Sequence, residues 1–96
     1  MAGSAAVYIM TNRKHGTLYT GVTSALVQRV HQHRSTTSTG FAARYGCRLL
    51  VYFERHDEIT TAIAREKQIK AGSRRKKIAL IEHLNPAWRD LYGDII

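Results

Sequence analysis

The chain has 96 residues, 44% of them hydrophobic, and its 15 lysines and arginines outnumber 7 acidic residues, giving a formal net charge of +8. This length predicts a single domain over residues 1–96 with a thin core, because so short a chain buries only roughly 60–65% of its unfolded surface. The composition excludes global disorder, and the single cysteine, Cys47, excludes an intramolecular disulfide or a thiolate zinc cluster. The charge predicts a polyanionic partner, with DNA or RNA preferred over an acidic protein or simple solubility.

Targeting segments and linkers are not evident. No apolar run is long enough to span a bilayer, and the first residues lack the charged and apolar regions of a signal peptide. The chain shows no internal repeat and no stretch with the composition of a linker. We therefore expect a cytoplasmic protein that does not associate with membranes.

The first elements in chain order form a predicted β-hairpin. Residues 5–11 (AAVYIMT) are apolar and rich in residues that favour strands. A polar turn over residues 12–16 ends in glycine, and residues 17–22 resume as a second strand. A glycine inside that strand, Gly21, predicts a close approach of the backbone to a neighbour, or a bulge.

A helix follows the hairpin. Thr23 or Ser24 can cap this helix, which runs to about Arg34. Its expected buried face consists of Leu26, Val27 and Val30. Residues 35–40 are a polar loop that either folds over a phosphate or only connects two elements, and residues 41–45 predict a turn of helix.

The strongest strand candidate is residues 48–54 (RLLVYFE), and a long helix over residues 58–71 comes after it. Asp57 precedes this helix as its expected N-terminal cap, and Gly72 ends it. Its expected inward stripe consists of Ile59, Ala62, Ile63, Glu66 and Ile69. A carboxylate in this stripe must find a cation, a hydrogen-bond donor or a metal, because an unpaired buried charge is costly. A salt bridge to a lysine or arginine at the core edge, or a rotated helix that exposes Glu66, would also satisfy the pattern.

The last elements complete the predicted fold. Residues 74–84 predict a third helix that Pro86 ends, and its apolar positions are Ile78, Leu80, Ile81 and Leu84. We expect Trp88, Leu91 and Tyr92 to tie the tail onto the core. The order strand, strand, helix, strand, helix, helix predicts an α+β fold, with a small antiparallel or mixed three-stranded sheet flanked by helices.

Four polar side chains in the hairpin and first helix could carry chemistry. Arg29 and His33 are four residues apart on the helix and share a face. Arginine offers a planar, charged fork that suits phosphate, and histidine can move a proton near neutral pH. Tyr8 and Tyr19 lie in the two strands, and a phenol needs a nearby cation or metal to become reactive. Taken singly, each tyrosine also fits ordinary packing, and Arg29 and His33 also fit a solvated helix face.

A run of basic residues marks the last two helices. Its members with an expected role in nucleic-acid binding are Lys67, Lys70, Arg74, Arg75 and Lys76. Such a run fits a surface that follows a phosphate backbone, although a merely solvated face has the same composition. The five histidines do not have the spacing of a zinc site.

The order and spacing of these residues resemble the GIY-YIG nuclease family. Residues 6–8 (AVY) stand at the first family motif and residues 19–21 (YTG) at the second. The helix that carries Arg29 and His33 follows, and Glu66 stands where the family has its metal-binding acid. Val7 and Thr20 replace the family's isoleucines and Ala6 replaces its first glycine, at positions that pack or turn rather than react.

The tail sharpens the resemblance. Residues 85–91 (NPAWRDL) look like the end of short stand-alone bacterial members, which resemble the N-terminal domain of the C subunit of the excision-repair nuclease. Asn85 is a candidate for the family's late asparagine.

The resemblance implies a metal-dependent endonuclease that hydrolyses phosphodiester bonds in DNA, selects structure rather than sequence and acts in DNA repair. Glu66 would hold Mg²⁺ or Mn²⁺, Arg29 would clamp a phosphate oxygen, and His33 would assist proton transfer. Tyr8 or Tyr19 would activate the attacking water, with Tyr8 preferred.

Two other functions are compatible with the residues. One is a basic nucleic-acid-binding module without turnover, in which Glu66 would pair with Arg29. The other is an interaction protein whose basic surface meets an acidic partner, and a protein partner could also supply targeting to a nuclease.

Overall fold

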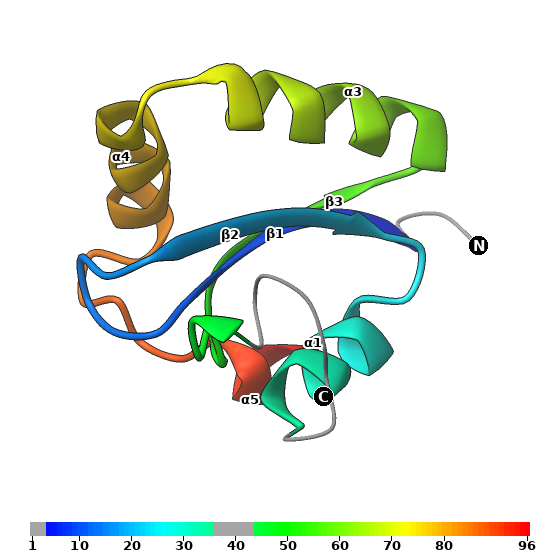
Figure 1. Cartoon of the computed structure of the whole chain (residues 1–96). Helices are drawn as coiled ribbons and strands as arrows, with labels where there is room; N and C mark the ends of the chain where they lie inside the picture. Colours follow the sequence, from blue (N-terminus) through cyan, green and yellow to red (C-terminus); the bar gives the residue numbers. More distant parts are fainter. Residues whose placement is uncertain (1–3, 36–43) are drawn as a thin grey trace.

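The computed structural model describes residues 4–35 and 44–96, in which a three-stranded antiparallel sheet lies between two layers of helices (Figure 1). The strands are β1 (Ala5–Thr11), β2 (Leu18–Thr23) and β3 (Leu49–His56), in the spatial order β2-β1-β3. β1 is central and pairs antiparallel with both neighbours. The predicted α+β fold is therefore confirmed.

The helices are α1 (Leu26–Arg34), α3 (Ile59–Ala71), α4 (Arg74–Leu84) and α5 (Tyr92–Ile95). α3 and α4 cover one face of the sheet, while α1 and α5 cover the other (Figure 1). The first three of these helices were expected, whereas the short α5 was not. Within the described residues, no helix combines the length and apolar character needed to cross a membrane.

Two helix starts differ from expectation. α1 begins at Leu26, with Ala25 at its N-cap position and no side-chain capping hydrogen bond. The Thr23 hydroxyl instead accepts from the backbone N–H of Ala25, the residue before the helix, at 2.9 Å. α3 begins after Glu58, whose side chain makes no capping hydrogen bond, so the expected cap by Asp57 is wrong. Both helices are held by packing on the sheet rather than by a side-chain cap, which is how tertiary contacts override local signals.

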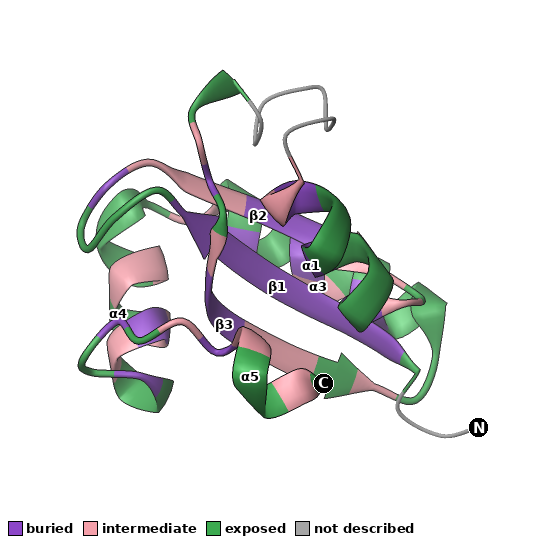
Figure 2. Ribbon diagram, turned by 90° about the horizontal axis from the view of Figure 1, so that it is seen from below, coloured by how far each residue is buried: buried purple, intermediate pink, exposed green. Residues whose placement is uncertain are grey.

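Alternation along β1 divides the core into two layers. All of β1 is buried, because helices cover both faces of the sheet (Figure 2). Val7 and Ile9 face α3 and α4, where they pack with Val51, Ala62, Ile69, Ile81 and Trp88. Tyr8 and Met10 face α1 and α5, where they pack with Leu26, Val30, Leu50 and Leu91. Tyr8 is thereby directed toward the helix that carries Arg29 and His33.

Several apolar residues that were expected in the core are exposed. Their exposed fractions are 38% for Val27, 41% for Ile59, 38% for Ile63 and 52% for Leu84. Each helix lies on one sheet face, so only the narrow stripe that touches the sheet is covered; on α3 that stripe is Ala62, Glu66 and Ile69. The predicted stripes were therefore too wide.

Hydrogen bonds of Asp90 attach the C-terminal segment to β3 and α1. One carboxylate oxygen of Asp90 accepts from the backbone N–H groups of Leu50 at 3.2 Å and Tyr92 at 3.1 Å. Its other oxygen accepts from Arg34 Nη1 at 2.5 Å. The Arg34 guanidinium also lies 4.5 Å from the centre of the Tyr92 ring. Trp88 and Leu91 are buried as well, so the expected docking of the tail is confirmed.

Candidate active site

Three rings meet on the α1 face of the sheet, and we call them the ring cluster: Tyr8, Tyr19 and His33. Tyr8 and Tyr19 share this face because Tyr8 pairs with Gly21 and Met10 pairs with Tyr19 across the β1–β2 ladder. The Tyr8 hydroxyl lies 2.8 Å from His33 Nε2. The His33 ring centre is 5.6 Å from that of Tyr8 and 5.1 Å from that of Tyr19. Two strands and one helix thus converge on one small polar site.

Gly21 makes room for the ring cluster. A Cβ atom at this position would lie 2.5 Å from both Cζ and Oη of Tyr8, closer than real Cβ contacts allow. The close approach expected at Gly21 is therefore confirmed, and its neighbour is Tyr8. The irregularity in the sheet register lies elsewhere, between Ile9 and Met10 where β1 pairs with β3.

Burial sets the protonation of the Tyr8–His33 pair. It raises the pKa of Tyr8 to about 12, against the opposing effect of a hydrogen bond from Arg29. Burial, and then the positive charge of Arg29, lower the pKa of His33. At neutral pH the phenol is therefore protonated and the imidazole is neutral. We assign the hydroxyl as donor and the Nε2 lone pair as acceptor, since a neutral imidazole offers one acceptor nitrogen.

Arg29 stands at the open side of the ring cluster. Its side chain is exposed, and Nη1 donates to Gln32 Oε1 at 3.2 Å. The hydrogen bond with Tyr8 raises the pKa of the guanidinium, which therefore stays charged. An accessible guanidinium beside a phenol and a neutral imidazole is suited to hold an anion near a proton acceptor.

Glu66 lies on α3, which covers the opposite face of the sheet and packs against β2, the strand of Tyr19. It is 8% exposed, as its place in the apolar stripe indicated. Its carboxylate pairs with Lys70 Nζ at 2.7 Å. The structure thus contains the lysine salt bridge that the sequence left open, and this ion pair involves Lys70 rather than Arg29.

The donors around Glu66 limit the kind of metal it could hold. Among the described residues, no group of three or more histidine, cysteine, aspartate or glutamate side chains is arranged to bind a metal ion. Mg²⁺ keeps several waters and needs only one or two carboxylates from a protein. A single carboxylate at the edge of the core fits such a hydrated ion, with the Lys70 ammonium as its competitor.

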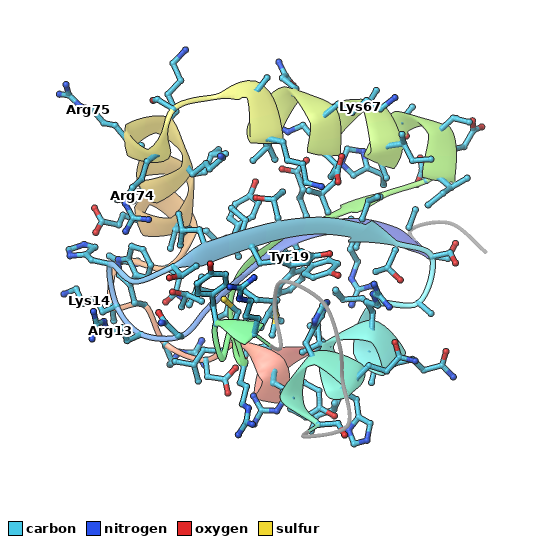
Figure 3. All side chains as sticks on the ribbon, in the orientation of Figure 1. Arg13, Lys14, Tyr19, Lys67, Arg74 and Arg75 are labelled. Carbon is cyan, nitrogen blue, oxygen red and sulfur yellow. The ribbon has the colours of Figure 1, made fainter. Side chains whose placement is uncertain are left out.

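The basic residues predicted to contact nucleic acid differ in their surroundings. Lys67 and Arg75 extend from α3 and α4 into solvent (Figure 3), and Lys76 is also exposed. Arg74 instead reaches the β1–β2 turn, where Nη2 donates to the carbonyls of His15 at 2.6 Å and Gly16 at 2.8 Å. Arg74 therefore joins α4 to the hairpin.

Asn85 is buried at the end of α4, where it holds the tail. Its Nδ2 donates to the carbonyls of Val51 at 3.1 Å and Arg89 at 2.8 Å, and its Oδ1 accepts from the Arg89 N–H at 3.0 Å. These bonds fasten the turn after α4 to β3. They account for the burial of this amide without a bound ligand.

The sequence of this chain is similar to those of known proteins. The sequence profile of the GIY-YIG catalytic domain matches residues 4–79. A UPF0213 protein of Staphylococcus saprophyticus is 35% identical over 71% of this chain and 83% of its own length. UPF0213 proteins of Natronomonas pharaonis and Haloquadratum walsbyi are also 35% identical, over 84% and 68% of this chain and 94% and 73% of their own lengths. Their names state no activity, and no solved structure matches the chain.

Proposed function

Because the chain belongs to the GIY-YIG catalytic domain family, whose members are nucleases acting on nucleic acid, we propose that it is a divalent-metal-dependent endonuclease that hydrolyses phosphodiester bonds in DNA. The observation that carries this proposal is the Tyr8–His33 hydrogen bond of 2.8 Å beside the exposed Arg29. It joins a proton path to an anion-binding group, which is what attack of water on a phosphate requires.

The ring cluster would activate the water. Tyr8 Oη takes a proton from the attacking water as its own proton passes to His33 Nε2, and Tyr19 orients that water. The oxygen of the resulting hydroxide bonds to phosphorus, and the bond from phosphorus to the 3′ oxygen breaks. That oxygen takes up a proton from solvent, and His33 later returns its extra proton to solvent. His33 can accept the proton because it is neutral.

The charged groups would stabilise the reacting phosphate. The Arg29 fork binds a non-bridging oxygen. Glu66 would hold Mg²⁺ or Mn²⁺, and Lys70 would release the carboxylate oxygen that it now contacts. The bound cation would stabilise negative charge on the phosphate and on the leaving oxygen.

We infer that the enzyme selects nucleic-acid structure rather than sequence. The exposed side chains Lys67, Arg75 and Lys76 suit phosphates, and phosphate contacts carry no sequence information. We propose that the protein acts in DNA repair in the cytoplasm, with a partner protein supplying targeting.

A cleavage assay tests the proposal. Purified protein is incubated with labelled single-stranded, duplex and flap DNA and with RNA, in Mg²⁺, Mn²⁺ or EDTA. We expect metal-dependent cleavage that is lost in Glu66→Gln, which keeps the shape of the side chain but removes its charge. Glu58→Gln is the matched control, because Glu58 is an exposed acid next to the same helix.

A binding module without turnover is the second candidate, and the Glu66–Lys70 ion pair favours it because that pair neutralises the acid. It predicts no cleavage in any metal, with salt-sensitive DNA binding that Glu66→Gln leaves unchanged. That result would overturn the proposed nuclease.

A further inference from the structure

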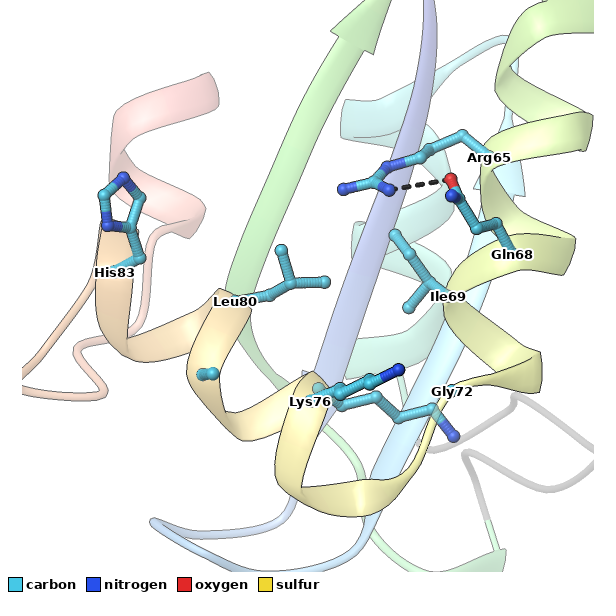
Figure 4. A pocket seen from close by; sticks show the side chains of 9 residues that line it. Arg65, Gln68, Ile69, Gly72, Lys76, Leu80 and His83 are labelled. Atoms are coloured by element: carbon cyan, nitrogen blue, oxygen red, sulfur yellow. Dashed lines mark hydrogen bonds between the residues drawn. The ribbon is translucent and has the colours of Figure 1, made fainter.

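A groove of about 430 Å³ lies between α3 and α4, on the face of the sheet away from the ring cluster (Figure 4). Its size falls in the range of small-ligand pockets. Ile69 of α3 and Leu80 of α4 point into it from either side (Figure 4), and Ala79 and Gly72 complete an apolar floor. We call it the α3–α4 groove.

The rim of the α3–α4 groove is basic. Lys76, Lys77, Arg65 and His83 line it, and no aspartate or glutamate is among the described residues that do so. An apolar floor below a cationic rim suits an anion that also carries a flat, weakly polar surface.

Arg65 is fixed in place before any ligand arrives. Its Nε donates to Glu54 Oε1 at 3.2 Å and Oε2 at 3.1 Å, and its Nη1 donates to Gln68 Oε1 at 2.8 Å. The carboxylate of Glu54 is itself held by the Tyr52 hydroxyl at 2.5 Å and by His56 Nε2 at 2.8 Å. A guanidinium plane held in this way can stack on a base.

The groove shares one lining residue with a second hollow that reaches the candidate active site. Lys77 lines both the α3–α4 groove and a second hollow of about 330 Å³, which Tyr19, Thr20 and Lys70 also line. Tyr19 belongs to the ring cluster, and Lys70 contacts Glu66. A strand that lies in the second hollow would therefore meet Lys77 at the edge of the groove.

We propose that the α3–α4 groove binds one unpaired nucleotide of the DNA strand that the enzyme cleaves; this rests on the proposed function. The base lies on Ile69 and Leu80, Arg65 stacks on it, and Lys76 and Lys77 contact the flanking phosphates. A base that is paired and stacked in a duplex cannot reach this floor. The preferred substrate therefore has a single-stranded segment next to the cleaved bond, as in a flap or an overhang.

Two alanine variants test the proposal. Ala79 and Ala64 are both exposed helical alanines, but only Ala79 lines the groove. Ala79→Glu places a carboxylate in the groove, and Ala64→Glu makes the same change of charge on the outer side of α3. The probes are a fluorescein-labelled oligothymidylate and the same strand with abasic nucleotides, and the readout is fluorescence anisotropy at fixed salt.

We expect Ala79→Glu to weaken binding of the oligothymidylate by about tenfold or more, the scale of losing one stacked base, and Ala64→Glu to weaken it by less than about twofold. The abasic strand should bind wild type and Ala79→Glu with a much smaller difference. Equal weakening by both variants, or equal binding of the two strands by wild type, would overturn the proposal. So would tight binding of an acidic peptide in the groove with no base-dependent DNA binding.

The anisotropy measurement is independent of turnover. Base-dependent binding without cleavage of any substrate would refute the nuclease and support the nucleotide site. Cleavage with no dependence on Ala79 would support the nuclease and refute the nucleotide site.

Discussion

The two faces of the sheet carry different kinds of chemistry. On the α1 face, Tyr8 and His33 are buried, neutral and joined by a hydrogen bond of 2.8 Å. On the α3 face, Glu66 is paired with Lys70, whose side chain is 52% exposed. A neutral pair inside the core is insensitive to salt, whereas an ion pair at the surface is screened and can exchange partners. The first face is therefore suited to a fixed proton path beside Arg29, and the second to the reversible binding of ions.

Removing Arg29 should have the largest effect, because Arg29 is the charged group beside the neutral Tyr8–His33 pair. Arg29→Ala should lower the cleavage rate by about 10²- to 10³-fold, the usual loss for one electrostatic donor. The fold should remain, because the side chain is exposed. Single-turnover rates and thermal unfolding measure both effects, with Gln28→Ala as the control on the exposed side of α1. A loss below about tenfold would contradict the phosphate-clamping role, since general positioning could explain it.

Filling the space at Gly21 tests whether the α1 face is fixed by packing. Gly21→Ala should lower the free energy of unfolding by about 1–3 kcal/mol, because the new methyl group meets the Tyr8 ring. Gly93→Ala is the matched control: nothing lies within 4 Å of its added Cβ, so stability should stay the same or rise slightly. Urea unfolding measures both. Equal stability of the two variants would show that Tyr8 moves freely.

The stability of the α1 face should depend on pH through His33. Burial and Arg29 lower its pKa, so the unfolded chain, with a histidine pKa near 6.5, takes up the proton first as pH falls. This contribution to stability is fully present above about pH 6.5 and is lost as pH falls through the lowered pKa of the folded state.

Urea unfolding at pH 7.5 and 5.5 checks this dependence. Wild type should lose more stability than His33→Gln over this interval, by up to about 1 kcal/mol. Glutamine keeps an oxygen that can accept from Tyr8 but does not titrate. Equal losses in the two proteins would refute a lowered pKa at His33.

The α3 face should show the smallest effect, through competition between Lys70 and a metal ion for Glu66. Lys70→Met should raise the affinity for Mn²⁺ by about two- to fivefold, because a half-exposed ion pair contributes at most about 1 kcal/mol. Lys67→Met removes the same charge from the same helix without breaking an ion pair to Glu66, and should not raise the affinity. Calorimetry distinguishes them. Weaker Mn²⁺ binding by Lys70→Met would contradict Glu66 as the ligand that Lys70 occupies.

The three strands and the hairpin pairing of β1 with β2 could be predicted from the sequence because local patterns determine them. Apolar runs indicate β1 and β3. The glycine-ended turn after β1 indicates that a second strand follows it as a hairpin. The burial of Glu66 could also be predicted, because Ala62 and Ile69 fix the inward face of α3. These features depend on neighbours within a few residues of one another.

The remaining features depend on contacts between residues far apart in the sequence. The Glu66–Lys70 ion pair is an exception, because a spacing of four residues on a helix brings the two side chains together. The attachment of Arg74 to the carbonyl of His15 joins residues 59 positions apart, so no local pattern could announce it. The exposure of Ile59 and Ile63 follows from how α3 lies on the sheet, which composition does not specify. A glycine within a strand predicted a close contact at Gly21, but the sequence did not identify Tyr8 as the residue in contact.

Asp90 has a consequence for where the catalytic unit ends. The family match stops at residue 79, yet Asp90 accepts hydrogen bonds from Leu50 in β3 and from Arg34, the last residue of the helix that carries His33. A chain truncated to the matched segment would keep every proposed catalytic side chain. It would lose the Asp90 hydrogen bonds that join α1 to β3. The segment that matches the family is therefore shorter than the structural unit that positions Tyr8, Tyr19 and His33.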